Sequence, residues 1–78
     1  MENLTLCGVK YYYTAGNILD NTIISVFDSS KTKLGCVVTD EDIAAFFDND
    51  KKRFEIKNLE LCESHLVRVF VACIIWTK

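Results

Sequence analysis

The chain contains no proline, only three glycines among its 78 residues, and a single histidine, His65. Because proline-rich and glycine-rich stretches are missing, the sequence shows no linker or low-complexity segment, and no internal repeat is visible. We therefore expect one domain that spans residues 1–78. Most catalytic templates lack parts in such a chain, and the common nucleotide-binding, zinc-protease and nucleophile-elbow motifs do not occur. The sequence predicts a protein that is not an enzyme.

Positive charge and targeting segments are also scarce. The formal net charge is −2, and the only basic cluster, residues 51–53, follows an acidic stretch, which argues against nucleic-acid binding. The first ten residues lack the basic and apolar regions of a signal peptide. The apolar run near the C-terminus is about ten residues long and contains Arg68, whereas a membrane-spanning helix needs roughly 20 residues. We expect a cytoplasmic protein without nucleic-acid or membrane partners.

The sequence offers no strong metal or cofactor site. Four cysteines, at positions 7, 36, 62 and 73, lie far apart in apolar runs without a C-x-x-C pair. This spacing favours reduced structural thiols over disulfides or zinc ligands. Residues 48–50 lack the further ligands of a calcium loop. Cys62 and His65 could form a catalytic pair, but a histidine in a surface turn is the preferred interpretation.

Five segments have the composition and hydrophobic pattern of β-strands. Glycine, asparagine, aspartate and serine residues in 15–21 and 28–33 indicate a loop and a hairpin turn, and a further turn is expected at 62–65. The predicted strands are residues 4–14, with a bend at Gly8, and residues 22–28, 34–38, 53–61 and 66–76.

The last of these segments, 66–76, is rich in β-branched residues, and both its odd and its even positions are apolar. A strand of this kind is expected at or near the centre of a sheet, with cover on both sides. Its even positions include Arg68, Phe70 and Trp76. A charge mixed with aromatic residues is more typical of a contact surface than of a closed core.

One helix is predicted, from residue 40 to residue 47 or 48. Thr39 and Asp42 have the spacing of a capping box, and Ile43, Phe46 and Phe47 follow at helical spacing. The sequence therefore predicts an α+β fold. It would be a small antiparallel sheet of four to five strands with one short helix packed on one face, in the order β-β-β-α-β-β.

Two further groups of residues are candidates for partner binding. Three consecutive tyrosines, Tyr11 to Tyr13, cannot all face a core because strand side chains alternate, and Tyr12 is the candidate for an outward position. The run from Asp40 to Asp50 contains five acidic residues and no base, so it could contact a basic partner, or serve as a solvated helix face. The acidic candidates are Asp40, Glu41, Asp48 and Asp50.

The small size, the missing catalytic motifs and the two-faced apolar segment together favour a small non-catalytic protein-binding module. An inhibitor of this kind could be a phage or viral accessory protein that binds a host defence protein directly. The alternative is a structural subunit that associates with itself through its sheet as a homodimer or larger homo-oligomer. No cofactor is expected in either case.

Overall fold

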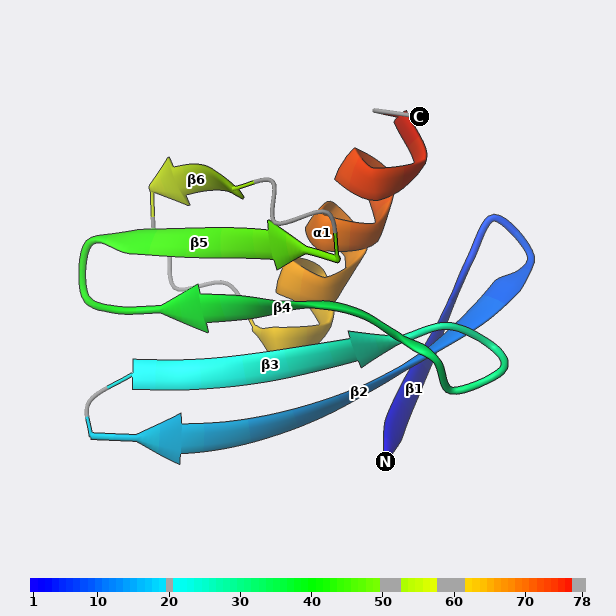
Figure 1. Cartoon of the computed structure of the whole chain (residues 1–78), viewed down its shortest axis with the longest axis horizontal. Coiled ribbons are helices and arrows are strands. Elements are labelled where there is room, and N and C mark those ends of the chain that lie inside the picture. The colour runs from blue at the N-terminus through cyan, green and yellow to red at the C-terminus, as the bar shows by residue number, and fades with distance from the viewer. Residues whose placement is uncertain (20, 50–52, 58–61, 77–78) are drawn as a thin grey trace.

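The computed structural model describes residues 1–19, 21–49, 53–57 and 62–76. Residues 75 and 76 are described by their backbone only. The described chain forms one six-stranded antiparallel sheet and one helix (Figure 1). The elements are β1 Glu2–Leu6, β2 Val9–Ile18, β3 Asn21–Phe27, β4 Lys33–Thr39, β5 Ile43–Asp48, β6 Arg53–Lys57 and α1 Glu63–Trp76. The α+β class is confirmed. The predicted strand number and the predicted order are wrong, because the sheet has six strands and the helix follows all of them.

Every strand pairs with the next strand of the chain, so the sheet is a simple meander. The first hairpin turns at Cys7 and Gly8, whose φ angles are 53° and 77°. Positive φ at both central residues is typical of a type I′ turn. The predicted bend at Gly8 is therefore a full reversal that divides residues 4–14 between two strands. The loop predicted for 15–21 is also wrong, because β2 continues to Ile18.

The next hairpin agrees with the sequence. Strands β3 and β4 confirm the predictions for residues 22–28 and 34–38. The turn between them is built on Asp28, whose Oδ1 accepts hydrogen bonds from the backbone N–H groups of Ser30 at 2.8 Å and Thr32 at 2.9 Å. Short polar side chains stabilise turns in this way.

The predicted helix at 40–48 is a strand, β5. The capping residue is Asp40 rather than Thr39. Its Oδ1 accepts hydrogen bonds from the N–H groups of Asp42 at 2.7 Å and Ile43 at 2.8 Å, and the Asp40 N–H donates to the Ile43 carbonyl at 3.0 Å. An aspartate that satisfies backbone N–H groups can start a turn as well as a helix. Here the resulting turn joins β4 to β5.

The predicted strand at 66–76 and the predicted turn at 62–65 are wrong, because Glu63–Trp76 form helix α1. The Leu66 N–H donates to the Cys62 carbonyl at 3.1 Å and begins the helix. The buried positions follow helical rather than alternating spacing, with Ile74 packed beside them. They are Leu66, Val67, Phe70 and Val71. A stripe of this kind covers a sheet face, and packing outweighs the β preference of valine and isoleucine.

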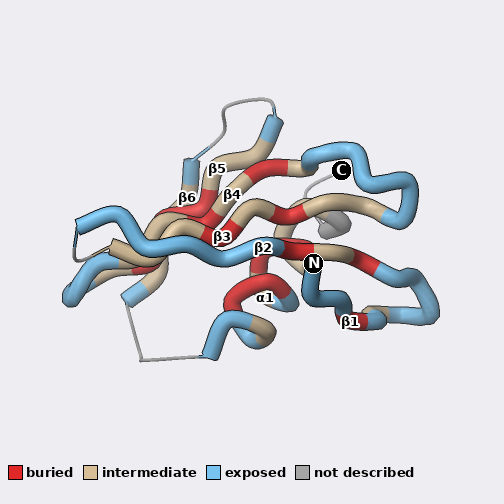
Figure 2. Tube along the Cα trace, turned by 90° about the horizontal axis from the view of Figure 1, so that it is seen from below, coloured by how far each residue is buried: buried red, intermediate tan, exposed pale blue. Residues whose placement is uncertain are grey.

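The core lies between α1 and one face of the sheet, as Figure 2 shows. Phe46 of β5 and Phe70 of α1 are completely buried, with ring centroids 6.2 Å apart. Phe54 of β6 packs on Phe46 at 4.9 Å. The strand prediction for 53–61 is confirmed over Arg53–Lys57, and its remainder, 58–61, lies outside the described residues. Within the described residues, no helix is both long enough and apolar enough to cross a membrane.

Candidate interaction surface

The sheet has a second face that α1 does not cover (Figure 2). Residues that lie opposite one another on neighbouring strands point to the same face, so the registers identify its members. Ile23 pairs with Val38, Cys36 with Phe47, and Tyr12 with Phe27. We call this surface the outer face. Its apolar members are Tyr12, Ile23, Phe27, Cys36, Val38, Ile43, Ala45 and Phe47.

Ile23, Cys36, Val38, Ala45 and Phe47 lie side by side on neighbouring strands, whereas Ser25 separates them from Phe27 and Tyr12 on the same face. Ala45 is buried between its neighbours, whereas Ile23, Phe27, Val38 and Phe47 are half-buried. No element of the described chain packs over these side chains, so their remaining surface is open to solvent. A contiguous apolar patch on a small protein is a typical mark of an interaction site.

Four basic residues lie along the rim of the outer face. The Lys31 ammonium group lies 5.4 Å from the Tyr12 ring centroid, and the Arg53 guanidinium group lies 5.5 Å from the Phe47 ring centroid. Lys33 stands opposite Phe27, and Lys57 stands opposite Ile43. Glu55 belongs to the same face and forms an ion pair with Arg53. Basic residues thus border much of the outer face, whereas the exposed acids Asp40, Glu41 and Asp42 precede Ile43 at one end of it.

The structure separates the contact residues predicted from the C-terminal segment. Phe70 is completely buried in the core, so its predicted role in a contact surface is wrong. Arg68 is exposed on α1. Residues two positions apart on a helix point about 200° apart, because each residue turns about 100°. Arg68 and Phe70 therefore do not share a face, and Trp76 is the last residue of α1. Tyr12 does lie on the outer face, half-buried.

The acidic candidates do not form one helical face. Asp40 and Glu41 are exposed in the turn before β5, whereas Asp48 is half-buried at the other end of that strand. Six strand residues span roughly 17–20 Å, so these groups are far apart. The hydrogen bonds from the backbone N–H groups of Ile43 and Asp42 hold the pKa of Asp40 below its ordinary value. Asp50 lies outside the described residues.

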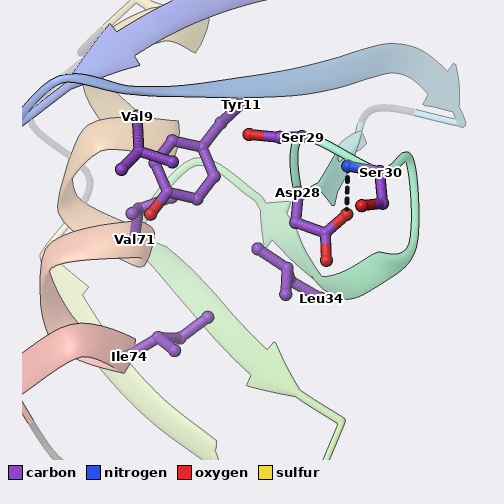
Figure 3. Close-up of a pocket in the computed structure, with 8 residues that line it drawn as sticks. All are labelled: Val9, Tyr11, Asp28, Ser29, Ser30, Leu34, Val71 and Ile74. Carbon is purple, nitrogen blue, oxygen red and sulfur yellow. Dashed lines mark hydrogen bonds between the residues drawn. The ribbon is translucent and has the colours of Figure 1, made fainter.

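A groove of about 350 Å³ opens on the other side of the molecule, between β2, the β3–β4 turn and α1 (Figure 3). Tyr11, Leu34, Val71 and Ile74 form much of its wall. Two of its polar side chains form hydrogen bonds with the backbone. Asp28 accepts hydrogen bonds from N–H groups of the β3–β4 turn, and the Ser29 hydroxyl donates to the Lys10 carbonyl at 2.6 Å. The groove is therefore lined both by apolar side chains beside the core and by polar residues of the turn.

Cys62 and His65 are in contact at the start of α1. The Cys62 Sγ lies 2.8 Å from His65 Nδ1 and 3.2 Å from the Ser64 hydroxyl. The Ser64 hydroxyl, followed by the backbone N–H and side chain of His65, lowers the pKa of the Cys62 thiol to about 7. The two residues of the possible catalytic pair are therefore in contact, at the start of a helix rather than in a hairpin turn. At neutral pH this exposed thiol is partly a nucleophilic thiolate.

Two of the four cysteines differ from their predicted setting as packed hydrophobes. Cys7 and Cys62 are exposed, whereas Cys36 and Cys73 are half-buried. The reason is local: Cys7 is a turn residue with positive φ, and Cys62 precedes a helix. Near this helix start, burial raises the pKa of Tyr13, and the negative charges of Glu2, Glu63 and Cys62 raise it further.

The sequence contains the residues of the outer face but gives no direct sign of it. Phe46 and Phe47 were expected on one helical stripe, whereas in β5 they point to opposite faces of the sheet. Residues 43–47 are all apolar, so their pattern does not alternate and does not show which side chains face outward. Comparisons of the chain with protein-family models, with curated proteins and with solved structures found no match.

Proposed function

We propose that this chain is a non-catalytic protein-binding module that acts through the outer face of its sheet. The observation that carries the proposal is the arrangement of the two layers: one helix covers one face, and a second face of similar length remains apolar and open. Antiparallel sheets that face water on one side normally carry polar residues there. Ile23, Val38 and Phe47 occupy such positions instead.

The chemistry of the outer face indicates the kind of partner. Its centre is aliphatic and aromatic, and its rim carries Lys31, Lys33, Arg53 and Lys57. We infer a protein surface with an apolar centre and flanking carboxylates, because opposite charges at a rim guide association and register. An inhibitor or adaptor works in this way by covering or bridging a surface of its target.

The test begins with a photo-crosslinking amino acid at Phe47 and, as a control, at Arg68, which is exposed on α1. Both proteins are irradiated in the cells that naturally produce the chain, and the adducts are identified by mass spectrometry. We expect one protein to be crosslinked from position 47 and not from position 68. Equal adducts from both positions, or none from position 47, would contradict the proposal.

Charge reversal then separates the rim from the rest of the surface. Lys33→Glu and Arg68→Glu change the net charge equally, but only Lys33 borders the outer face. With the crosslinked protein purified, we expect Lys33→Glu to weaken binding several-fold at low salt and Arg68→Glu to leave binding unchanged. Equal effects would reject the outer face as the contact surface. Adducts that disappear with nuclease would assign it to nucleic acid instead.

A further inference from the structure

The two edges of the sheet differ in their chemistry. One edge is β6, and the other is shared between β1 and the second half of β2. Strand β1 pairs with β2 only from Val9 to Tyr13, whereas β3 pairs with β2 as far as Ile18. The segment Thr14–Ile18 therefore has a strand on one side and, in the described chain, none on the other. In Figure 1 it runs along the lower border of the sheet, away from β1.

The registers show which backbone groups point outward from this edge. Ile18 and Asn21 flank the turn between β2 and β3, so they form a hydrogen-bonded pair. Hydrogen-bonded pairs recur at every second residue of an antiparallel ladder, so Gly16 and Ile23 form the next such pair. The N–H and C=O groups of Ala15 and Asn17 then point away from β3. Tyr13, two residues before Ala15, directs its N–H and C=O groups to the same side, where it pairs with Glu2 of β1.

Charge protects one edge and not the other. Strand β6, with the sequence RFEIK, carries three charged residues among five, whereas Thr14–Ile18 carries none. If β6 paired antiparallel with a second copy about Glu55, Glu55 would face Glu55 and Arg53 would face Lys57. Like charges in directly opposite positions destabilise a strand pair. Charged edges block unwanted pairing, so the uncharged edge is the one suited to pairing.

Exposed apolar residues lie at the two ends of the same edge. Ile18 is 61% exposed and Leu19, in the turn that follows, is 94% exposed with a φ of 56°. Met1, which precedes β1, is 64% exposed. The left-handed conformation is sterically unfavourable for leucine. Burial within the monomer does not compensate for it, because the Leu19 side chain is exposed.

We propose that two copies of this chain pair antiparallel along Thr14–Ile18, with the two-fold axis at Gly16. Ala15 of each copy then bonds to Asn17 of the other through both N–H and C=O. Ile18 and Leu19 of one copy approach Met1 of the other. The result is one continuous sheet with six strands from each copy. This proposal goes beyond the binding function and does not depend on it: edge pairing leaves both outer faces open, on the same side of the dimer.

The test uses the position at the axis. A Cβ atom on Gly16 meets nothing within 4 Å, so substitutions fit the monomer. Gly16→Lys or Gly16→Glu places like charges opposite each other, and we expect each variant to raise the dimer dissociation constant by ~10-fold or more. An equimolar mixture of the two should recover dimerisation as a heterodimer. Gly16→Thr, which is neutral and favours strands, should remain dimeric. Mass is measured by sedimentation equilibrium.

Further variants distinguish this edge from other contacts. Ala15→Pro removes an N–H that points outward and leaves the β2–β3 ladder intact, so we expect a folded protein with weakened dimerisation. Lys33→Glu, at the rim of the outer face, should leave the dimer mass unchanged. A wild-type protein that is monomeric at every concentration overturns the proposal. So does a dimer that tolerates Gly16→Lys, or a charge-swapped mixture that stays monomeric.

Discussion

Gly35 of β4 lies directly beneath the ring of Phe70 in α1. A Cβ atom at position 35 would stand 2.6 Å from Phe70 Cζ and would also collide with the carbonyl oxygen of Phe47. The φ angle of Gly35 is 157°, which side-chain-bearing residues rarely adopt. The missing side chain therefore allows the helix to approach the sheet and the completely buried ring of Phe70 to enter the core.

Gly35→Ala is expected to destabilise the protein by about 2–4 kcal/mol, because overpacking and backbone strain add. A small domain has only ~5 kcal/mol of stability, so the variant would retain only ~1–3 kcal/mol. Chemical denaturation followed by circular dichroism measures the loss. Gly16→Ala is the matched control and should change stability by less than ~1 kcal/mol, since its Cβ position is open. Similar losses in both variants would refute the packing argument.

Phe70→Ala should lower the free energy of unfolding by about 3–5 kcal/mol, because it leaves a cavity beside Phe46. Arg68→Ala, two residues earlier and exposed, should change it by no more than ~0.5 kcal/mol. The pair is compared by urea denaturation. A stable Phe70→Ala protein would return Phe70 to the surface role that the sequence suggested.

The sequence predicted the β3–β4 hairpin correctly and the helix wrongly. Asp28 and its polar neighbours specify a turn through local hydrogen bonds, so the β3–β4 hairpin could be read directly. The segment from Leu66 was ambiguous. Valines and isoleucines favour strands by propensity, yet apolar residues at both odd and even positions also fit a helix whose stripe packs on a sheet. Only the requirement to cover Ile24, Val26 and Val37 decides between the two.

The outer face could not be predicted because residues 40–48 have the pattern of a helix start. A helix there would bury Ile43 and Phe47, which leaves Arg68 and Trp76 as the surface candidates. The contact of Cys62 with His65 depends on a helical turn that brings residues three apart together. The spacing was visible in the sequence, but a hairpin turn at 62–65 gave no reason for the two side chains to meet.

Asp40→Ala should destabilise the protein more than Thr39→Ala, because Asp40 rather than Thr39 holds the β4–β5 turn. The pKa of Asp40 is lowered in the folded state by the Ile43 and Asp42 N–H groups. Its contribution is therefore complete above the ordinary aspartate pKa and is lost as the pH falls through the lowered value. Denaturation midpoints of the wild type and both variants, measured from neutral to acidic pH, test this. A larger loss in Thr39→Ala would restore the predicted capping box.

Cys62 should react with iodoacetamide faster than Cys7 at neutral pH, although both thiols are exposed. The thiolate is the attacking species: its sulfur forms the bond to carbon as iodide leaves. The rate of Cys62 should rise with pH about a midpoint near 7, in line with the pKa of about 7 that the Ser64 hydroxyl and His65 produce. Modification at each site is followed by mass spectrometry of the folded protein.

Two substitutions test the cause of this reactivity. Ser64→Ala removes the hydrogen bond that contributes most to lowering the Cys62 pKa, and His65→Ala removes the imidazole 2.8 Å from the sulfur. Each should move the midpoint of the Cys62 rate to higher pH and leave Cys7 unchanged. Because the His65 backbone N–H remains in both variants, part of the shift should persist. Equal rates at Cys62 and Cys7 in the wild type would show that the helix start does not activate this thiol.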